Sequence, residues 1–250
     1  MQREGERKLS LYPIAYPLSP TAGYRIYKSL KVVVSAWALL IFVLILIMIL
    51  ARKLVIDMNS ITNYIDESGI LITSDIIKSG ITKTQLYDFI RDNGFEQISH
   101  GIYASPDTWT DENYVLALRC PNAVFSHDEA LYYHSLIDRE PAQRTITIYS
   151  GYSTSRLVKD GIKVYTVKKD LLDVGKTTII NSFGHEIPIY DMERTICDLV
   201  RNRKQFEIQD YQTALKTYVS RKDKDLNRLM KYAKLFHVDS KIREYMEVIL

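Results

Sequence analysis

The stretch MNSITNYIDESGILITSDIIKSGITKTQLYDFIRDNGFEQISHGIYASPD, residues 58–107, decides the fold of the first part of this chain. It holds three short helical patterns, each with a capping residue in front of apolar residues at helical spacing. Ile61, Tyr64 and Ile65 form the apolar side of the first pattern. The expected caps are Asn59 or Ser60, then Thr73 or Ser74, then Thr82, and the expected ends are Gly69, Gly80 and Asn93-Gly94.

Two short strand patterns follow the third helix. Residues 95–98 and 102–104 each predict a strand, and Ser99-His100-Gly101 between them predicts a tight turn. Two supporting helices, a third helix and a hairpin are the elements of a winged helix, in the order of that fold. This fold commonly places its third helix in a DNA groove, so control of transcription is the first hypothesis.

The third predicted helix has two faces of different character. Leu86, Phe89 and Ile90 repeat on one face and predict a buried stripe. The candidate DNA-binding residues are Lys83, Thr84, Tyr87 and Arg91 on the other face and His100 at the tip of the wing.

The net charge of residues 58–107 disfavours DNA as the partner. Residues 58–107 contain three Lys or Arg and seven Asp or Glu, a net charge of −4. Phosphate contacts from basic side chains supply most non-specific affinity for DNA, so this segment alone should bind DNA weakly. A winged helix that binds another protein is therefore the alternative.

The pattern changes after Pro106 to strands and helices of an α+β domain. Ser126 with Glu129 predicts a capping box, Asp191 a further cap, and His134 a satisfied buried histidine. Strands are predicted at 144–149, 163–168, 177–181 and 186–190. Helices are predicted at 111–119, after Ser126, and as four C-terminal stripes around 193–200, 211–219, 226–233 and 242–249.

Signatures of catalysis and of metal or cofactor binding are weak. We find no glycine-rich phosphate loop, HExxH or GxSxG motif in the sequence, so we expect no enzyme, catalytic residue, cofactor or metal. His127, Asp128 and Glu129 lie together, but helix capping is the preferred interpretation. Cys120 and Cys197 lie on apolar helical patterns and are expected to be buried free thiols.

Positive charge gathers near the C-terminus. Residues 194–243 hold thirteen Lys or Arg and six Asp or Glu, a net charge of +7. A solvated helical surface is the simplest interpretation, with nucleic-acid contact as the alternative. Arg201, Arg203 and Lys204 are the candidates for a functional basic surface, and the polar loop 150–156 is a candidate for recognition.

Residues 32–51, VVVSAWALLIFVLILIMILA, are twenty uncharged and mostly apolar residues. Such a run predicts a transmembrane helix. Its flanking charges weakly favour a cytoplasmic N-terminus, which would export the winged helix. Either the chain is a single-pass membrane protein with cytoplasmic C-terminal domains, or translation begins at Met58. We expect the second, a cytoplasmic protein that contacts membrane only if residues 32–51 are made.

From Met58 onward the chain resembles the AbiEi-type antitoxins of type IV toxin–antitoxin systems, which belong to bacterial abortive-infection modules against phage. Five segments carry the resemblance in order. They are GITKTQLYDFIRDNGFEQISHGIYASPDTW at 80–109, FSHDEALYYHSLIDR at 125–139, GIKVYTVKKD at 161–170, FGHEIPIYDMERTICDLVRNR at 183–203 and LKTYVSRKDKDLNRLMKYAKLF at 215–236.

The resemblance implies two activities. The winged helix, residues 58–107, would bind inverted repeats in promoter DNA of its own operon and repress it. The antitoxin domain, residues 108–250, would counteract a neighbouring nucleotidyltransferase-like toxin without forming a stable complex with it. Residues 1–57 would be an N-terminal extension. The alternatives are a winged-helix protein-interaction module and a membrane-anchored transcriptional regulator without antitoxin activity.

Overall fold

The structure, a computed structural model, describes residues 39–48 and 61–249 of the 250-residue chain. The chain divides into two units, residues 1–63 and 64–250, and each is described by itself. In the first unit, residues 39–48 form a helix whose side chains are exposed. The expected span at 32–51 extends outside the described residues at both ends, and Asn59, Ser60 and the expected start at Met58 also lie outside them. Of the helices that are described, none combines the length and the apolar character that crossing a membrane requires.

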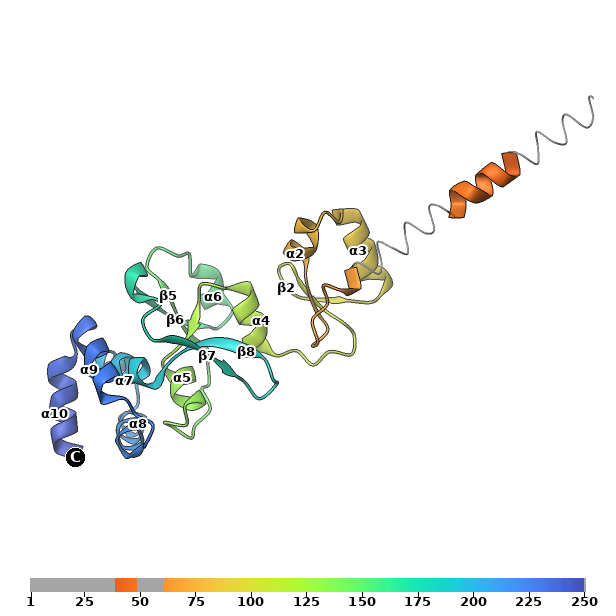
Figure 1. Cartoon of the computed structure of the whole chain (residues 1–250). Helices are drawn as coiled ribbons and strands as arrows, with labels where there is room; N and C mark the ends of the chain where they lie inside the picture. Colours follow the sequence, from red (N-terminus) through yellow and green to blue (C-terminus); the bar gives the residue numbers. More distant parts are fainter. Residues whose placement is uncertain (1–38, 49–60, 250) are drawn as a thin grey trace, which may run out of the picture. The chain divides into compact units, whose positions relative to one another are not determined.

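Residues 64–107, called the N-terminal module below, carry two helices beside a three-stranded antiparallel sheet (Figure 1). The sheet order is β1-β3-β2, so the hairpin β2–β3 pairs with a strand that precedes both helices. The predicted second helix, third helix and hairpin are confirmed, whereas strand β1 was not expected. The elements are β1 (Ile70–Ile72), α2 (Thr73–Lys78), α3 (Lys83–Asp92), β2 (Glu96–Ser99) and β3 (Ile102–Ala104).

The helix predicted through Ile65 does not reach that residue. Residues 61 and 62 are helical, but Ile65 forms an isolated antiparallel bridge with Leu71. The cause is Asp66, whose Oδ1 accepts the backbone N–H groups of Ser68 (3.0 Å) and Ile70 (2.8 Å). Such bonds between a side chain and nearby backbone compete with helical bonds, and here they turn the chain into β1.

The cap prediction is right for α3 and wrong for α2. Thr82 Oγ1 accepts the N–H of Gln85 (3.4 Å), and Gln85 Oε1 accepts the N–H of Thr82 (3.0 Å), which completes a capping box. Thr73 already lies inside α2. Its N–H (2.9 Å) and its hydroxyl (3.2 Å) both donate to the carbonyl of Gly101, so the residue ties α2 to the hairpin turn.

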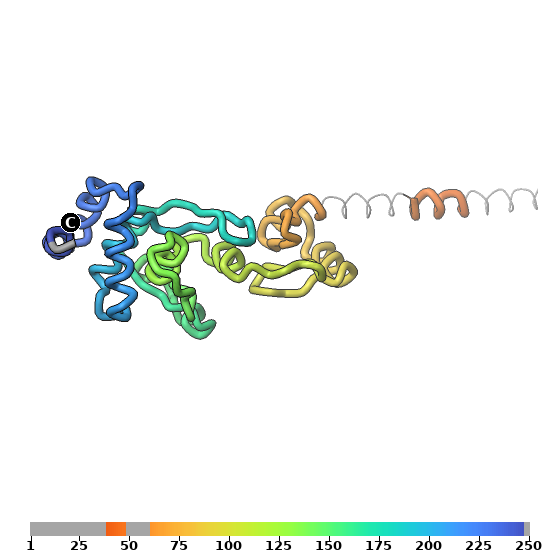
Figure 2. The backbone as a smooth tube through the Cα atoms, turned by 90° about the horizontal axis from the view of Figure 1, so that it is seen from below, coloured from red at the N-terminus to blue at the C-terminus, as the bar shows by residue number. Residues whose placement is uncertain are grey.

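Residues 108–249 form a mixed five-stranded sheet with helices (Figure 1), and the strand order is β6-β5-β4-β8-β7. Figure 2 shows the course of the same backbone after a turn of 90°. The pairs β5–β6 and β4–β8 are parallel, and the others are antiparallel. The strands are β4 (Val124–Phe125), β5 (Thr145–Tyr149), β6 (Lys163–Val167), β7 (Lys176–Ile180) and β8 (Glu186–Tyr190). The helices are α4 (Glu112–Arg119), α5 (Asp128–Tyr133), α6 (Ser155–Lys159), α7 (Met192–Arg201), α8 (Ile208–Ser220), α9 (Leu226–Leu235) and α10 (Asp239–Ile249), with 3-10 turns at Lys169–Leu171 and Arg203–Gln205.

These elements confirm the predicted α+β class with small sheets and a C-terminal group of helices. The capping box predicted at Ser126 is wrong, because the residue before α5 is His127 with φ 55° and ψ −120°. Ser126 Oγ instead accepts the hydroxyl of Thr147 (2.8 Å) on the neighbouring strand β5. Asp191 does cap α7, since its side chain accepts the N–H of Arg194 (2.8 Å).

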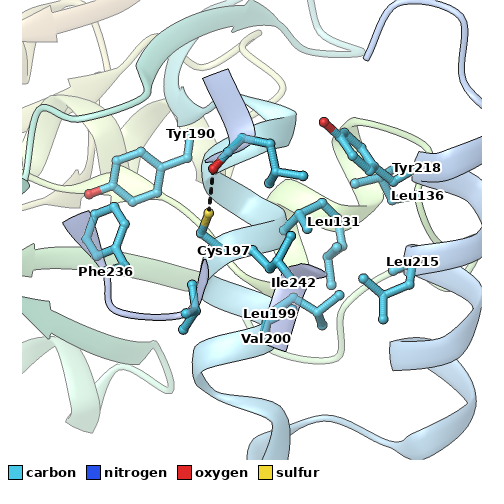
Figure 3. Packing of buried hydrophobic residues seen from close by; sticks show 14 of the residues in the cluster. Leu131, Leu136, Tyr190, Cys197, Leu199, Val200, Leu215, Tyr218, Phe236 and Ile242 are labelled. Carbon is cyan, nitrogen blue, oxygen red and sulfur yellow. Dashed lines mark hydrogen bonds between the residues drawn. The ribbon is translucent and has the colours of Figure 1, made fainter. Parts of the chain in front are cut away.

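Two apolar clusters lie against the five-stranded sheet. Ile146 and Ile148 of β5 belong to the cluster that α4 and α6 cover. The other cluster joins α5 and the end of β8 to the C-terminal helices, and Figure 3 shows part of it around Cys197. Cys197 and Cys120 are both buried free thiols, as predicted.

A buried arginine connects the sheet to the helices of this second cluster. Arg194 is 0% exposed, and its Nε donates to Asp198 Oδ2 (2.9 Å) one turn further along α7. Its Nη1 donates to the carbonyls of Leu171 (3.0 Å) and Val174 (2.6 Å). The guanidinium carbon also lies 4.0 Å from the ring centroids of Tyr190 and Phe236, which end β8 and α9. Burial nevertheless raises the pKa of Asp198, against the effect of the guanidinium.

Gly175 makes room for this arginine. It has φ +78°, and a Cβ at this position would lie 2.5 Å from Cβ of Arg194. Any other residue would therefore be strained by its backbone conformation and would also collide with α7.

We predict that Arg194→Met lowers the free energy of unfolding by about 3–5 kcal/mol, because Asp198 would keep a buried charge without a cation. Urea denaturation at pH 7 measures this change. The double variant Arg194→Met/Asp198→Asn removes both charges of this pair and is expected to be more stable than the single variant. A double variant that is no more stable would show that the ion pair is not the cause.

Candidate nucleic-acid interface

Helix α3 presents an apolar face to the core and a polar face to solvent. Leu86, Phe89 and Ile90 are buried as predicted. The candidate residues Lys83, Thr84, Tyr87 and Arg91 are all exposed on the opposite side of the helix. The structure thus brings these four side chains to one surface, and their contact with DNA remains a prediction.

Lys83 and Arg91, the two cations of this surface, differ in how readily they could bind a phosphate. Arg91 forms ion pairs with Asp88 (2.9 Å) and Asp92 (3.0 Å), and the hydrogen bond and charge of Asp92 raise the pKa of Arg91. A phosphate would have to compete with both carboxylates for this guanidinium. Lys83 at the start of α3 is therefore the better candidate for a phosphate contact.

Tyr87 lies next to the hairpin β2–β3, and His100 lies in the turn of that hairpin. Burial raises the pKa of Tyr103 on β3, and the neighbouring Tyr87 hydroxyl raises it further. Tyr87 therefore contacts the sheet through its hydroxyl, although its side chain is 50% exposed. His100 is exposed in the turn between β2 and β3. Because Thr73 binds the adjacent carbonyl of Gly101, the position of this turn is fixed relative to α2.

The other face of the module's sheet packs against α4. Ile70 of β1 and Ile102 of β3 share an apolar cluster with Val115 of α4. Partly buried side chains extend this cluster from both partners: Ile98, Tyr114 and Leu118. The sheet of the N-terminal module is thus covered by residues of the following region, and the two share a small core.

A polar network borders this apolar contact. The hydroxyl of Tyr114 on α4 donates to Asp66 Oδ2 (3.1 Å), and the Tyr114 ring stacks on His185 with a centroid distance of 4.1 Å. His185 Nδ1 lies 2.6 Å from Asp111 Oδ2, and its Nε2 is hydrogen-bonded to the hydroxyl of Ser68. The turn that begins the module is therefore bound to the β7–β8 hairpin.

Gly69 shows how closely the two regions approach. It has φ +73°, and a Cβ there would lie 2.3 Å from Thr108 Oγ1 and 2.8 Å from Ser105 Oγ. The sequence alone did not predict this network, because no periodic pattern connects side chains that lie 48 to 117 positions apart. The one available signal was the Asp66-Glu67-Ser68-Gly69 run, which is typical of a turn.

The basic candidates near the C-terminus are exposed but not equivalent. Arg203 donates to the Tyr245 hydroxyl (3.1 Å) and lies 5.2 Å from the Tyr211 ring centroid. Arg201 lies 5.8 Å from the ring centroid of Phe236, and Lys204 is exposed in the turn after α7. Arg194, which contributed to the expected basic surface, is buried in the core, so the surface begins at Arg201.

Hydrogen bonds hold the rings of His127 and His134, which flank α5. His127 stacks on Tyr165 with a centroid distance of 3.4 Å, its Nδ1 lies 2.9 Å from Ser126 Oγ, and its Nε2 lies 3.0 Å from Asn202 Nδ2. Burial, then the charge of Lys163, keep its pKa well below the usual value, so the imidazole is neutral. His134 Nε2 lies 2.6 Å from the Tyr190 carbonyl, which satisfies this ring as predicted, although the side chain is half-buried and not fully buried as expected.

Comparisons with known proteins add little to this geometry. No protein-family model matches the chain, and neither does a curated protein. Among solved structures, the chain is similar to the crystal structure of the RV2827C protein from Mycobacterium tuberculosis, with 13% sequence identity and a TM-score of 0.49. This similarity covers 68% of this chain and 67% of that chain. A similarity of this degree carries no information about function.

We predict that Tyr114→Ala loosens the contact between the module and the region that follows it, because the variant loses the bond to Asp66 and the stack on His185. Hydrogen exchange of the backbone amides of Ser68 and Ile70 should accelerate by about tenfold or more as this turn opens locally. Exchange followed by mass spectrometry measures this change. Tyr132→Ala, an exposed tyrosine of α5, is the matched control, and equal acceleration in both variants would contradict the prediction.

Proposed function

We propose that this chain is an autorepressing antitoxin of a type IV toxin–antitoxin system. Its N-terminal module would act as a winged helix on inverted repeats in its own promoter. Its C-terminal region would counteract a nucleotidyltransferase-like toxin without binding it stably. The resemblance to AbiEi-type antitoxins supports both activities, and we expect the protein to act in the cytoplasm from a start at Met58.

The observation that carries the DNA-binding half is the division of α3 into two faces. A buried apolar face fixes the helix against the sheet, and the polar face exposes Lys83, Thr84 and Tyr87, which would enter a groove. The hairpin β2–β3 follows α3 directly, as a wing does. Inverted repeats offer two equivalent half-sites, so we expect two copies of the module on one operator.

The charge of the module limits how the DNA-binding proposal can work. With a net charge of −4 over residues 58–107, few phosphates can be neutralised by one copy. Affinity would then depend on base contacts and on two copies acting together. The same charge supports the alternative in which the module binds a protein.

A membrane-anchored regulator without antitoxin activity is the remaining alternative. The helix at 39–48 exposes apolar side chains along its whole length, from Leu39 at 67% to Met48 at 71%. Such a surface favours contact with lipid if these residues are made.

We predict that the purified protein retards a fragment of its own promoter more strongly than a scrambled fragment in a gel-shift assay. Lys83→Ala and Tyr87→Ala should weaken this binding, and Lys83→Ala should lower the log–log salt slope by about one unit. Lys78→Ala, which removes an exposed lysine from α2, is the control and should bind like the wild type. Equal retardation of both fragments would remove the repressor proposal.

We predict that repression and antitoxin activity can be separated by point variants of the full chain. Lys83→Ala/Tyr87→Ala should lose repression of a promoter reporter but still rescue cells that express the neighbouring toxin. Arg201→Ala/Lys204→Ala should show the opposite loss, with exposed Lys231→Ala on α9 as control. Truncation at residue 107 is a poorer test, because it would expose the apolar cluster around Val115.

Rescue that fails whenever repression fails would show that protection works through repression alone. In that case the C-terminal region would have no antitoxin activity of its own, and the second half of the proposal would be wrong.

A further inference from the structure

The carboxylate of Glu129 is buried without a partner among the described side chains. Glu129 is 6% exposed, and its backbone N–H donates to Thr145 Oγ1 (3.0 Å), whereas its carboxylate accepts no hydrogen bond from the described side chains. The charges that act on the carboxylate most strongly, Glu140 and Asp128, are both negative. Together with burial, which is the largest cause, they raise the pKa of Glu129 to about 7. Burying a carboxylate without a cation is unfavourable, and such groups often mark binding sites.

Glu129 faces a recess of about 130 Å³. Its wall includes two acids, two tyrosines, an amide and an arginine: Glu129, Glu140, Tyr132, Tyr133, Asn113 and Arg144. Arg144 is the one cation among the lining residues, and other groups hold it. Its Nη2 bonds to the Glu112 carboxylate, and its Nε donates to Asn113 Oδ1 (2.9 Å).

Two other polar groups of the wall bind each other, since Asn113 Nδ2 donates to the Tyr133 hydroxyl (2.8 Å). Glu129 and Glu140 are therefore the acids of this wall that have no cation as a partner among the described residues. Across the described residues, no three His, Cys, Asp or Glu side chains gather as a metal site. The aromatic walls favour an organic cation, because a tyrosine ring attracts a cation over its face.

The recess opens into a larger groove of about 810 Å³, with which it shares Tyr132, Tyr133 and Glu140. Three large apolar side chains of this groove are exposed: Trp109 at 88%, Ile180 at 70% and Phe183 at 55%. The groove also carries the acids Asp111, Glu112, Asp138 and Glu140 against Arg144 alone. Exposed aromatic residues beside acidic groups fit a protein partner that is both apolar and basic.

We propose that the recess binds the guanidinium or ammonium group of an arginine or lysine from a protein partner, whose neighbouring apolar side chains lie in the groove. The incoming cation would pair with Glu129 and Glu140 beside the rings of Tyr132 and Tyr133, which contact each other edge to face. The groove would bury the exposed Trp109 and Phe183. This surface is distinct from α3, and the proposal does not depend on the proposed function.

Calorimetry with the full chain at pH 8 tests the proposal with two acetylated pentapeptide amides, Ala-Leu-Arg-Leu-Ala and the same peptide with citrulline in place of arginine. Citrulline keeps the shape of arginine but is neutral. The arginine peptide is expected to bind more tightly by about tenfold or more, because its charge pairs with a desolvated carboxylate. Equal affinities, or no binding of either peptide, would overturn the proposal.

Two variants test whether the difference in affinity between the arginine and citrulline peptides arises in the recess. Glu129→Gln should reduce the affinity for the arginine peptide by about tenfold and leave the citrulline peptide unaffected. It replaces an uncompensated buried charge by a neutral amide, so it should not lower the melting temperature, which is the check on folding. Glu244→Gln, at an exposed position of α10, is the matched control and should bind like the wild type.

The pH dependence gives an independent measurement. Only ionised Glu129 pairs with the cation, so a pKa of about 7 predicts that affinity for the arginine peptide falls about tenfold between pH 8 and pH 6. Asp128, Glu140, Tyr132, Tyr133 and Arg144 are the other titratable or charged groups near this carboxylate. The same dependence in Glu129→Gln would assign it to one of those groups and overturn the role of Glu129.

A last comparison distinguishes a protein partner from a small cation. Trp109→Ala should weaken binding of the arginine peptide, because its leucines would contact the groove. Spermidine is the comparison ligand. Tighter binding of spermidine than of the peptide, with no effect of Trp109→Ala on either, would overturn the protein partner and leave a site for a small organic cation.

Discussion

The guanidinium of Arg194 is withdrawn from solvent and holds together parts of the chain that are far apart in sequence. It lies between the rings of Tyr190 and Phe236, pairs with Asp198, and donates to two carbonyls of the loop before β7. A buried charge persists only where the surrounding groups satisfy it, so these contacts must form together. The position of α7, and with it the cluster that joins the sheet to the C-terminal helices, depends on this one side chain.

The N-terminal module depends on the following region in a comparable way. Its sheet has helices on one face, and the other face would be exposed without Val115 and its neighbours on α4. Tyr114, His185 and Asp66 add polar contacts at the edge of this small core. The proposed DNA-binding module and the region that follows it therefore share one packed contact.

Local patterns predicted much of the fold because the forces that form helices and hairpins act over a few residues. The cap at Thr82, the stripe of Leu86, Phe89 and Ile90, and the hairpin through Gly101 were all readable from the sequence. The same reasoning failed at Ile65, Thr73 and Ser126. At each of these positions a side chain or backbone group bonds to a partner outside its expected helix, and that partner cannot be identified from neighbouring residues.

The sequence by itself determined the α+β class, the order of the elements from β2 onward apart from the short strand β4 and the short helix α6, and which face of α3 is polar. It could do so because periodicity and capping depend only on residue spacing. Only the tertiary structure decided that Arg194 lies in the core and not on the basic surface, and that Arg91 is paired with carboxylates. It also decided that Glu129 faces a recess without a cation. Burial and pairing depend on which distant segments meet, and that information is absent from local spacing.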